Sequence, residues 1–159
     1  MRSSLALNFC KLLIRLKFPH IRQISTKDFA QWLLNSTKTQ PLVIDARSQA
    51  EYEVSHLKAA VHIDPIAPDL QPLSEVVKNT PIVVYCSIGY RSATIAQQLQ
   101  QAGFSRVFNL SGGLFQWANE GRLMFQNEEA TQCIHPYNAM WGKLLKDGKL
   151  TQSRRGAER

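Results

Sequence analysis

Cysteine is scarce in this sequence, and its three copies are widely scattered. Cys10, Cys86 and Cys133 contain no Cys-x-x-Cys pair, which argues against both a disulfide framework and a structural zinc site. Histidine is equally sparse and shows no metal-ligand spacing. We therefore expect free thiols, as in the reducing cytoplasm, and neither a metal nor a cofactor.

Glycine and proline are also few, at 8 and 7 of the 159 residues, which excludes collagen-like and low-complexity chains. Charged residues make up 19% of the chain against 44% that are hydrophobic. This composition favours a folded protein with a proper core over a disordered chain. The length fits one domain of ordinary size with short extensions, and we place that domain at residues 23–125.

Acidic residues are missing from the N-terminal end. Residues 1–27 contain six basic residues and no acid, whereas residues 28–142 carry a net negative charge within a chain of net charge +7. A nucleic-acid-binding domain would need a basic face on its body, so nucleic acid is not expected as a partner.

Long hydrophobic runs are absent as well. Lys11, Arg15 and Lys17 interrupt the leucine-rich start, and no stretch reaches the roughly 20 apolar residues of a membrane span. We interpret residues 1–22 as a basic extension that is mobile or could contact a membrane surface as a weak interfacial helix. The alternative is an organelle transit peptide, which would replace the cytoplasmic location with an organelle.

What the sequence does contain is an alternation of short apolar runs with helical patterns. Strands are predicted at 42–44, 61–63, 82–85 and 106–110, and helices are predicted after a cap at Ser25 or Thr26, after Ser48, after the 86–92 loop and after the glycines at 112–113. The run at 82–85 is apolar without alternation, as in a strand buried on both faces of a parallel sheet. The class is therefore α/β with a mainly parallel sheet.

Residues 126–159 are less regular, and we treat them as a C-terminal extension. One more helix is predicted around 140–145, and residues 149–159 are expected to be disordered. The segment 133–146 is rich in aromatic and apolar side chains, including Tyr137, Met140, Trp141 and Leu144. We predict that it folds back onto the domain, because these side chains would otherwise leave an apolar patch in water.

The candidate nucleophile is Cys86, at the carboxyl end of the clearest strand, where parallel α/β sheets place their sites. The loop that follows can aim several backbone N–H groups inward, and such a nest stabilises a thiolate. Gly89 permits the turn, Arg91 adds a fixed positive charge, and Ser87 and Ser92 can add hydroxyl donors. For Cys10 and Cys133 we expect no catalytic role.

Four motifs in order resemble the rhodanese family of sulfurtransferases, over residues 24–124. They are VIDAR at 43–47 with EY at 51–52 and SHL at 55–57, AAVHI at 59–63, CSIGYRSA at 86–93, and LSGG at 110–113 with Trp117. The resemblance implies a single domain with a five-stranded parallel sheet flanked by helices. It also implies a persulfide on Cys86, loaded from thiosulfate or a persulfidated protein and passed to a thiol or protein acceptor, with Arg91 binding the anionic donor.

The loop departs from the family at one position. Many members carry a basic residue directly after the cysteine, where this chain has Ser87. That change favours a persulfide or protein-bound donor over the doubly charged thiosulfate. Ile88 and Tyr90 make the rim of the loop partly apolar, which suits a larger partner.

Two other functions remain open at this point. A cysteine phosphatase or arsenate reductase also uses a Cys–Arg loop, but it needs five residues between the two, and here four separate Cys86 from Arg91. A non-catalytic sulfur carrier or partner-docking module is the stronger alternative, because a fold does not fix a function.

Several residues near the strand ends are expected to support the site. Asp45 and Arg47 lie at the end of one strand, and we expect Arg47 to form a structural ion pair with Glu51. His56 is interpreted as a hydrogen-bonded loop anchor rather than a base. The pair Gly112 and Gly113 predicts a tight turn whose amides could face the site.

Overall fold

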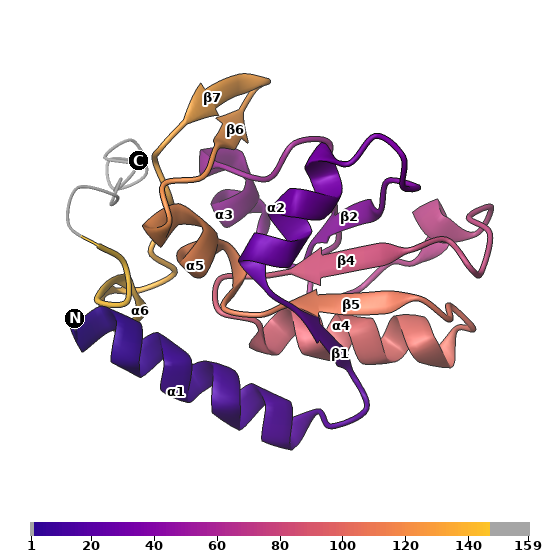
Figure 1. Cartoon of the computed structure of the whole chain (residues 1–159), viewed down its shortest axis with the longest axis horizontal. Coiled ribbons are helices and arrows are strands. Elements are labelled where there is room, and N and C mark those ends of the chain that lie inside the picture. The colour runs from indigo at the N-terminus through magenta and orange to yellow at the C-terminus, as the bar shows by residue number, and fades with distance from the viewer. Residues whose placement is uncertain (1, 147–159) are drawn as a thin grey trace.

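The computed structural model describes residues 2–146. Its centre is a five-stranded sheet in the order β1-β5-β4-β2-β3, in which all neighbouring strands are parallel (Figure 1). The strands are β1 (Arg22–Ile24), β2 (Leu42–Asp45), β3 (Val61–His62), β4 (Ile82–Tyr85) and β5 (Val107–Leu110). The expected α/β fold with a five-stranded parallel sheet is confirmed.

Helices cover both faces of this sheet, so that two buried clusters form. They are α1 (Arg2–Lys17), α2 (Thr26–Leu34), α3 (Gln49–Val54), the 3-10 turn η1 (Gln71–Leu73), α4 (Tyr90–Gln101), α5 (Gly113–Asn119) and α6 (Ala139–Gly142). Alternate residues of the central strands point to opposite faces: Val83 packs with α2 and α5, whereas Val84 packs with α4. The central strand β4 is buried along its whole length, as its unbroken apolar run predicts.

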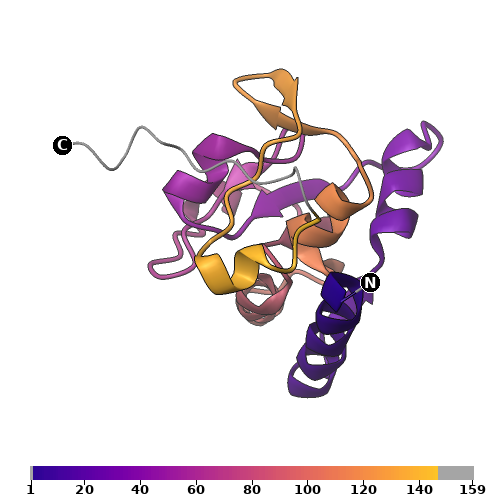
Figure 2. The same cartoon turned by 90° about the vertical axis from the view of Figure 1, so that its left-hand side faces the viewer.

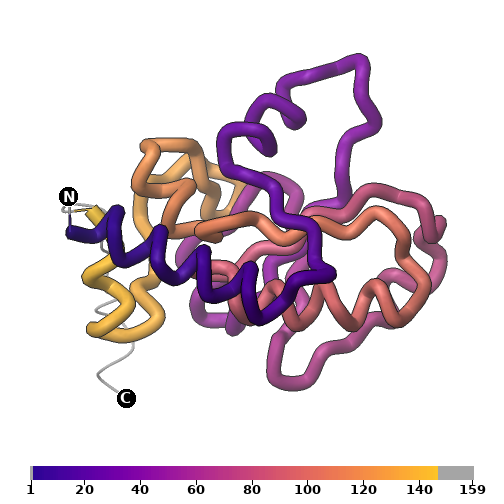
Figure 3. The backbone as a smooth tube through the Cα atoms, turned by 60° about the horizontal axis from the view of Figure 1, so that its bottom comes forward, coloured from indigo at the N-terminus to yellow at the C-terminus, as the bar shows by residue number. Residues whose placement is uncertain are grey.

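The N-terminal segment, which we expected to be either mobile or a weak interfacial helix, is helical. Residues 2–17 form α1, which runs along the edge of the molecule beside α5 and α4 (Figures 1 and 3). Leu7 is buried in the cluster on one side of the sheet, and Ile14 is buried in the cluster on the other side. The helix is therefore attached to the domain by one of its faces.

Two further elements were not predicted. The edge strand β1 pairs with β5, so the sheet includes residues 22–24. An antiparallel hairpin of β6 (Met124–Gln126) and β7 (Glu129–Thr131) follows the last helix of the sheet. His56 forms a backbone bridge with Phe125, which ties this hairpin to the loop after α3.

The C-terminal segment folds back onto the domain, as its aromatic content predicts. Ile134, Leu144 and Leu145 are buried in the same cluster as α5, and the backbone carbonyl of Leu144 accepts a hydrogen bond from Asn119. Figure 2 shows the segment crossing the domain before it reaches α6. The expected disorder at 149–159 falls outside the residues that the structure describes.

Candidate active site

Cys86 lies directly after β4, in a short loop that ends at the first turn of α4. Its side chain is almost completely buried, and its Sγ atom accepts a hydrogen bond of 3.1 Å from the backbone N–H of Gly89. Gly89 precedes α4 with a φ of +111°, which only glycine adopts readily. The turn at Gly89 thus brings a helix-terminal amide onto the sulfur, where partial positive charge favours an anion.

The N-terminus of α5 fixes the other side of this loop. The amides of Leu114 and Phe115 donate to the carbonyls of Cys86 and Ser87, at 2.8 and 3.0 Å. A Cβ atom on Gly113 would lie 2.5 Å from the Cys86 carbonyl oxygen and 2.6 Å from that of Ser87. Gly113 therefore allows close packing of α5 on the loop, whereas a Cβ atom on Gly112 would meet Gln116 and Lys11. That the amides of the two glycines could face the site stays a prediction.

Ser92 supplies a second polar neighbour for the sulfur. Its Oγ atom lies 3.4 Å from Sγ of Cys86 and 2.6 Å from Oδ1 of Asn109. Asn109 is held in turn because its amide nitrogen donates to the Gly89 carbonyl at 2.9 Å. A hydroxyl has one proton to donate, so Ser92 can serve Asn109 or a charged sulfur, but not both at full strength. Sequence reasoning missed Asn109, because its role depends on the parallel pairing of β5 with β4.

Arg91 is paired rather than open to solvent. Both of its terminal nitrogens donate to the carboxylate of Glu51 at 2.8 Å, and Nη2 also donates to Ser87 Oγ at 3.0 Å. Ser87 donates to the same carboxylate, not to the sulfur as we expected. Burial alone disfavours an ionised Glu51, but Arg91 and the N–H and hydroxyl of Ser48 outweigh it and lower the pKa of Glu51 to about 2. The charge of Arg91 is therefore largely neutralised at neutral pH.

The expected ion pair between Arg47 and Glu51 is wrong. Arg47 pairs with Asp45 instead, at 2.7 Å, and both side chains are completely buried. Tyr85 donates to the same Asp45 carboxylate at 2.6 Å, and Arg47 also donates to the Ser55 carbonyl. Burial disfavours the charge of Arg47, yet Asp45 raises the pKa of its guanidinium above the ordinary value. This network braces the strand ends and does not line the cavity.

His56 lies beside that network and acts as an anchor, as predicted. Its Nδ1 atom lies 2.9 Å from the Tyr52 carbonyl, and its ring stacks on that of Tyr52 at 4.1 Å.

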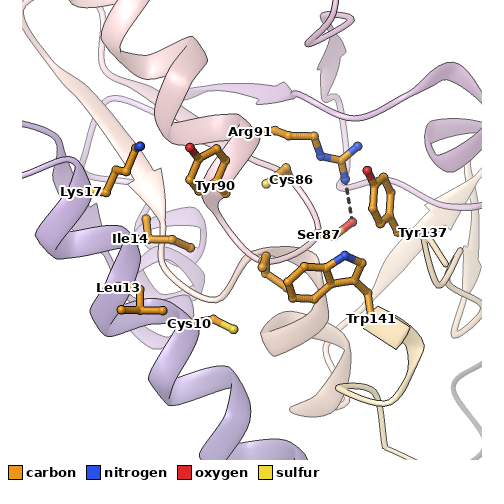
Figure 4. A pocket seen from close by; sticks show the side chains of 11 residues that line it. Cys10, Leu13, Ile14, Lys17, Cys86, Ser87, Tyr90, Arg91, Tyr137 and Trp141 are labelled. Atoms are coloured by element: carbon orange, nitrogen blue, oxygen red, sulfur yellow. Dashed lines mark hydrogen bonds between the residues drawn. The ribbon is translucent and has the colours of Figure 1, made fainter. Parts of the chain in front are cut away.

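A cavity of about 450 Å³ lies in front of the Cys86 loop (Figure 4). Its walls come from three parts of the chain that are distant in sequence: α1, the loop with the start of α4, and the C-terminal segment. The lining residues are Cys10, Leu13, Ile14, Lys17, Cys86, Ser87, Ile88, Tyr90, Arg91, Tyr137 and Trp141. Most of these present carbon to the cavity, so it is an apolar slot with one cation, Lys17, on α1 and one paired cation, Arg91, beside the loop.

The C-terminal wall explains the aromatic residues that the sequence singled out. The guanidinium of Arg91 lies 4.6 Å from the ring centre of Tyr137, within range of a cation–π contact. Tyr137 and Trp141 thus form the C-terminal wall of the cavity. The high aromatic content of this segment predicted that it packs on the domain, but not that it lines the cavity. On the opposite wall, burial raises the pKa of the Cys10 thiol, which keeps that thiol protonated at neutral pH.

A parallel sheet that carries a cysteine loop at its carboxyl edge, with the N-terminus of a helix packed on that loop, defines a class of α/β protein with a buried cysteine at the sheet edge. The sequence profile of the rhodanese-like domain matches residues 26–120, so the chain belongs to the rhodanese-like domain family. The thiosulfate sulfurtransferase GlpE of Coxiella burnetii is 37% identical over 81 residues, which cover 50% of this chain and 74% of that protein. A sulfurtransferase of Allochromatium vinosum is 31% identical over 105 residues, covering 64% of this chain and 92% of that protein.

Other proteins that resemble this chain are not named sulfurtransferases: one is named for a different activity, and another is named only for its domain. The tRNA uridine(34) hydroxylase of Sodalis glossinidius is 32% identical over 88 residues, which span 25% of that protein. Among solved structures, a rhodanese-like domain protein of Staphylococcus aureus superposes with a TM-score of 0.56 at 26% identity, over 67% of this chain and 99% of that one. The family is thus established, and its relatives include sulfurtransferases.

Proposed function

We propose that this protein is a sulfurtransferase that carries a sulfane sulfur as a persulfide on Cys86. The observation that carries the proposal is the placement of Sγ, which faces the cavity and accepts the Gly89 amide at 3.1 Å. The same donor can stabilise the negative charge of a thiolate or a persulfide without a separate base. Relatives named sulfurtransferases support this assignment.

The reaction has two displacement steps. The Cys86 thiolate attacks the sulfane sulfur of the donor, so that a new S–S bond forms, the donor's S–S bond breaks, and its remainder leaves as an anion. An acceptor thiolate then attacks the outer sulfur of the persulfide and restores the Cys86 thiolate. Neither step needs an outside oxidant or reductant, and splitting the transfer in two is the usual advantage of covalent catalysis.

We infer that the preferred donor is a persulfide rather than thiosulfate. Thiosulfate carries two negative charges, and Glu51 already neutralises Arg91 at the loop. Position 87 supplies a serine hydroxyl that is also bound to Glu51. A persulfide with an apolar body suits a slot lined by Leu13, Ile88 and Trp141 better than a small dianion does.

Intact mass spectrometry tests the proposed function. Purified protein incubated with a low-molecular-weight persulfide should gain the mass of one sulfur atom, and a thiol or cyanide should remove it. Cys86→Ser should show no gain, whereas Cys133→Ser, a cysteine outside the cavity, should load as the wild type does. A folded wild-type protein that never gains sulfur would support the non-catalytic docking module instead.

Replacing Glu51 with glutamine tests the inference about the donor. Glu51→Gln keeps the shape and the helix-capping position but removes the charge that neutralises Arg91. The KM for thiosulfate should fall about three- to tenfold, which corresponds to roughly 1 kcal/mol of added attraction. Glu120→Gln, which breaks a surface ion pair with Arg122, should leave that KM unchanged. An unchanged or higher KM in Glu51→Gln would show that Arg91 does not meet the donor.

A further inference from the structure

The outer face of α1 is a row of largely exposed apolar side chains, of which Leu13 also reaches the wall of the cavity. Leu5, Phe9, Leu12, Leu13 and Leu16 are between 49 and 69% exposed. A rotation of 100° per residue places most of them opposite Leu7 and Ile14, the two side chains by which α1 is buried in the domain. Figures 1 and 3 show α1 at the edge of the molecule, with its outer side uncovered.

This row differs from the ordinary exposed residues of the surface. Leu34 and Ile66 are 86 and 92% exposed, but Leu34 lies beside Leu33 at the end of α2 and Ile66 lies outside any helix or strand, and scattered exposed apolar residues need no explanation. Along α1, by contrast, the apolar residues from Leu5 to Leu16 follow one another over about three turns of a single helix. A continuous row of this kind marks a surface that is covered in the working state of the protein.

The charges beside the row indicate what covers it. Helical rotation places Arg15 on one side of the row and Lys17 on the other, with Arg2 close to the row at its N-terminal end, whereas Lys11 turns toward the domain near Gly112. No acidic residue occurs before Asp28, and the ion pairs found within residues 2–146 involve no residue of α1. An apolar row between two basic borders is the pattern of a helix that lies in the surface of an anionic membrane.

We propose that the outer face of α1 docks this protein onto anionic lipid membranes. The helix lies flat in the interface, because none of the helices in residues 2–146 is long and apolar enough to cross a bilayer. A second copy of the chain is a poorer occupant, since pairing two such helices would bring their basic borders together with no acid to neutralise them. The proposal goes beyond sulfur transfer and does not depend on the chemistry of Cys86.

Vesicle co-sedimentation of the full chain tests the proposal. The wild type should pellet with phosphatidylcholine vesicles that contain phosphatidylglycerol, remain soluble with phosphatidylcholine alone, and dissociate as salt is raised. Phe9→Ser with Leu16→Ser should reduce partitioning at least tenfold. The matched pair Leu34→Ser with Ile66→Ser should bind as the wild type does, and Arg2→Gln with Arg15→Gln should weaken binding without touching the apolar row.

Three outcomes would overturn the proposal. The first is a wild type that stays soluble with anionic vesicles, and the second is equal binding by the Phe9/Leu16 variant. The third is a stable dimer in sedimentation analysis that the same variant converts to monomers, which would assign the row to a second copy. Thermal unfolding of each variant shows whether it is folded, and sulfur loading of Cys86 is measured separately, so failure of the membrane proposal leaves the sulfurtransferase proposal standing.

Discussion

Gly113→Ala is expected to destabilise the protein and to prevent sulfur loading. Its φ of +58° and a new Cβ atom 2.5 Å from the Cys86 carbonyl oxygen act together, and the atoms that would have to move are backbone. Left-handed backbone costs a non-glycine residue about 1 kcal/mol, and overpacking adds roughly 1–3 kcal/mol. To relieve the contact, α5 must withdraw from the loop, and the amide that faces the sulfur loses its position.

Gly121→Ala is the matched control for this prediction. Gly121 also has a positive φ, of +72°, but a Cβ atom there would meet nothing within 4 Å. We expect it to lose only about 1 kcal/mol, from the backbone alone, and to load sulfur normally. Urea unfolding and the mass of the loaded protein measure both effects. Equal losses in the two variants would mean that close packing of α5 on the loop has no role in the site.

Arg47→Met is expected to cost about 3–5 kcal/mol of unfolding free energy, because it leaves the Asp45 carboxylate buried and without its cation. Arg122→Met removes an ion pair of similar length at the surface, where both partners are about 30% exposed, and should cost less than about 1 kcal/mol.

Tyr85→Phe should lose an amount of unfolding free energy between those of Arg122→Met and Arg47→Met, and it tests the same buried network if Arg47→Met does not fold. It removes one hydrogen bond to Asp45 and one from the Leu57 amide, for about 1–3 kcal/mol. Chemical denaturation ranks the three variants. Similar costs for Arg47→Met and Arg122→Met would show that the buried network is not what holds the strand ends together.

The parts of the fold that could be predicted are those with a strong local pattern. The apolar runs of β2 and β4 and the glycine turn after Cys86 are local, and the resemblance supplied the number of strands. The edge strand β1 has three residues, Arg22–Ile24, with no apolar pattern, and it forms only because β5 offers a partner 86 residues further on. Its existence is a property of the tertiary structure.

The candidate site shows the same division between local and distant contacts. We predicted an ion pair between Arg47 and Glu51, but Arg47 precedes α3 and its guanidinium turns back to Asp45. Glu51 belongs to the capping box of α3 and faces Arg91, 40 residues away. Likewise, Cys10 and Trp141 line one cavity from opposite ends of the chain. Such encounters depend on chain reversals that no local pattern encodes.

The attachment of α1 through Leu7 and Ile14 has a consequence for proteolysis. Each of these residues fills a different one of the two cores, and the same helix supplies Cys10, Leu13 and Lys17 to the cavity wall. A cleavage between α1 and β1 that released the helix would therefore expose both cores. It would also remove one wall of the cavity, so that bulky proteins could reach the Cys86 thiol. If sulfur transfer and membrane docking occur as proposed above, cleavage would change the size of the acceptors that reach Cys86 and would release the protein from the lipid surface.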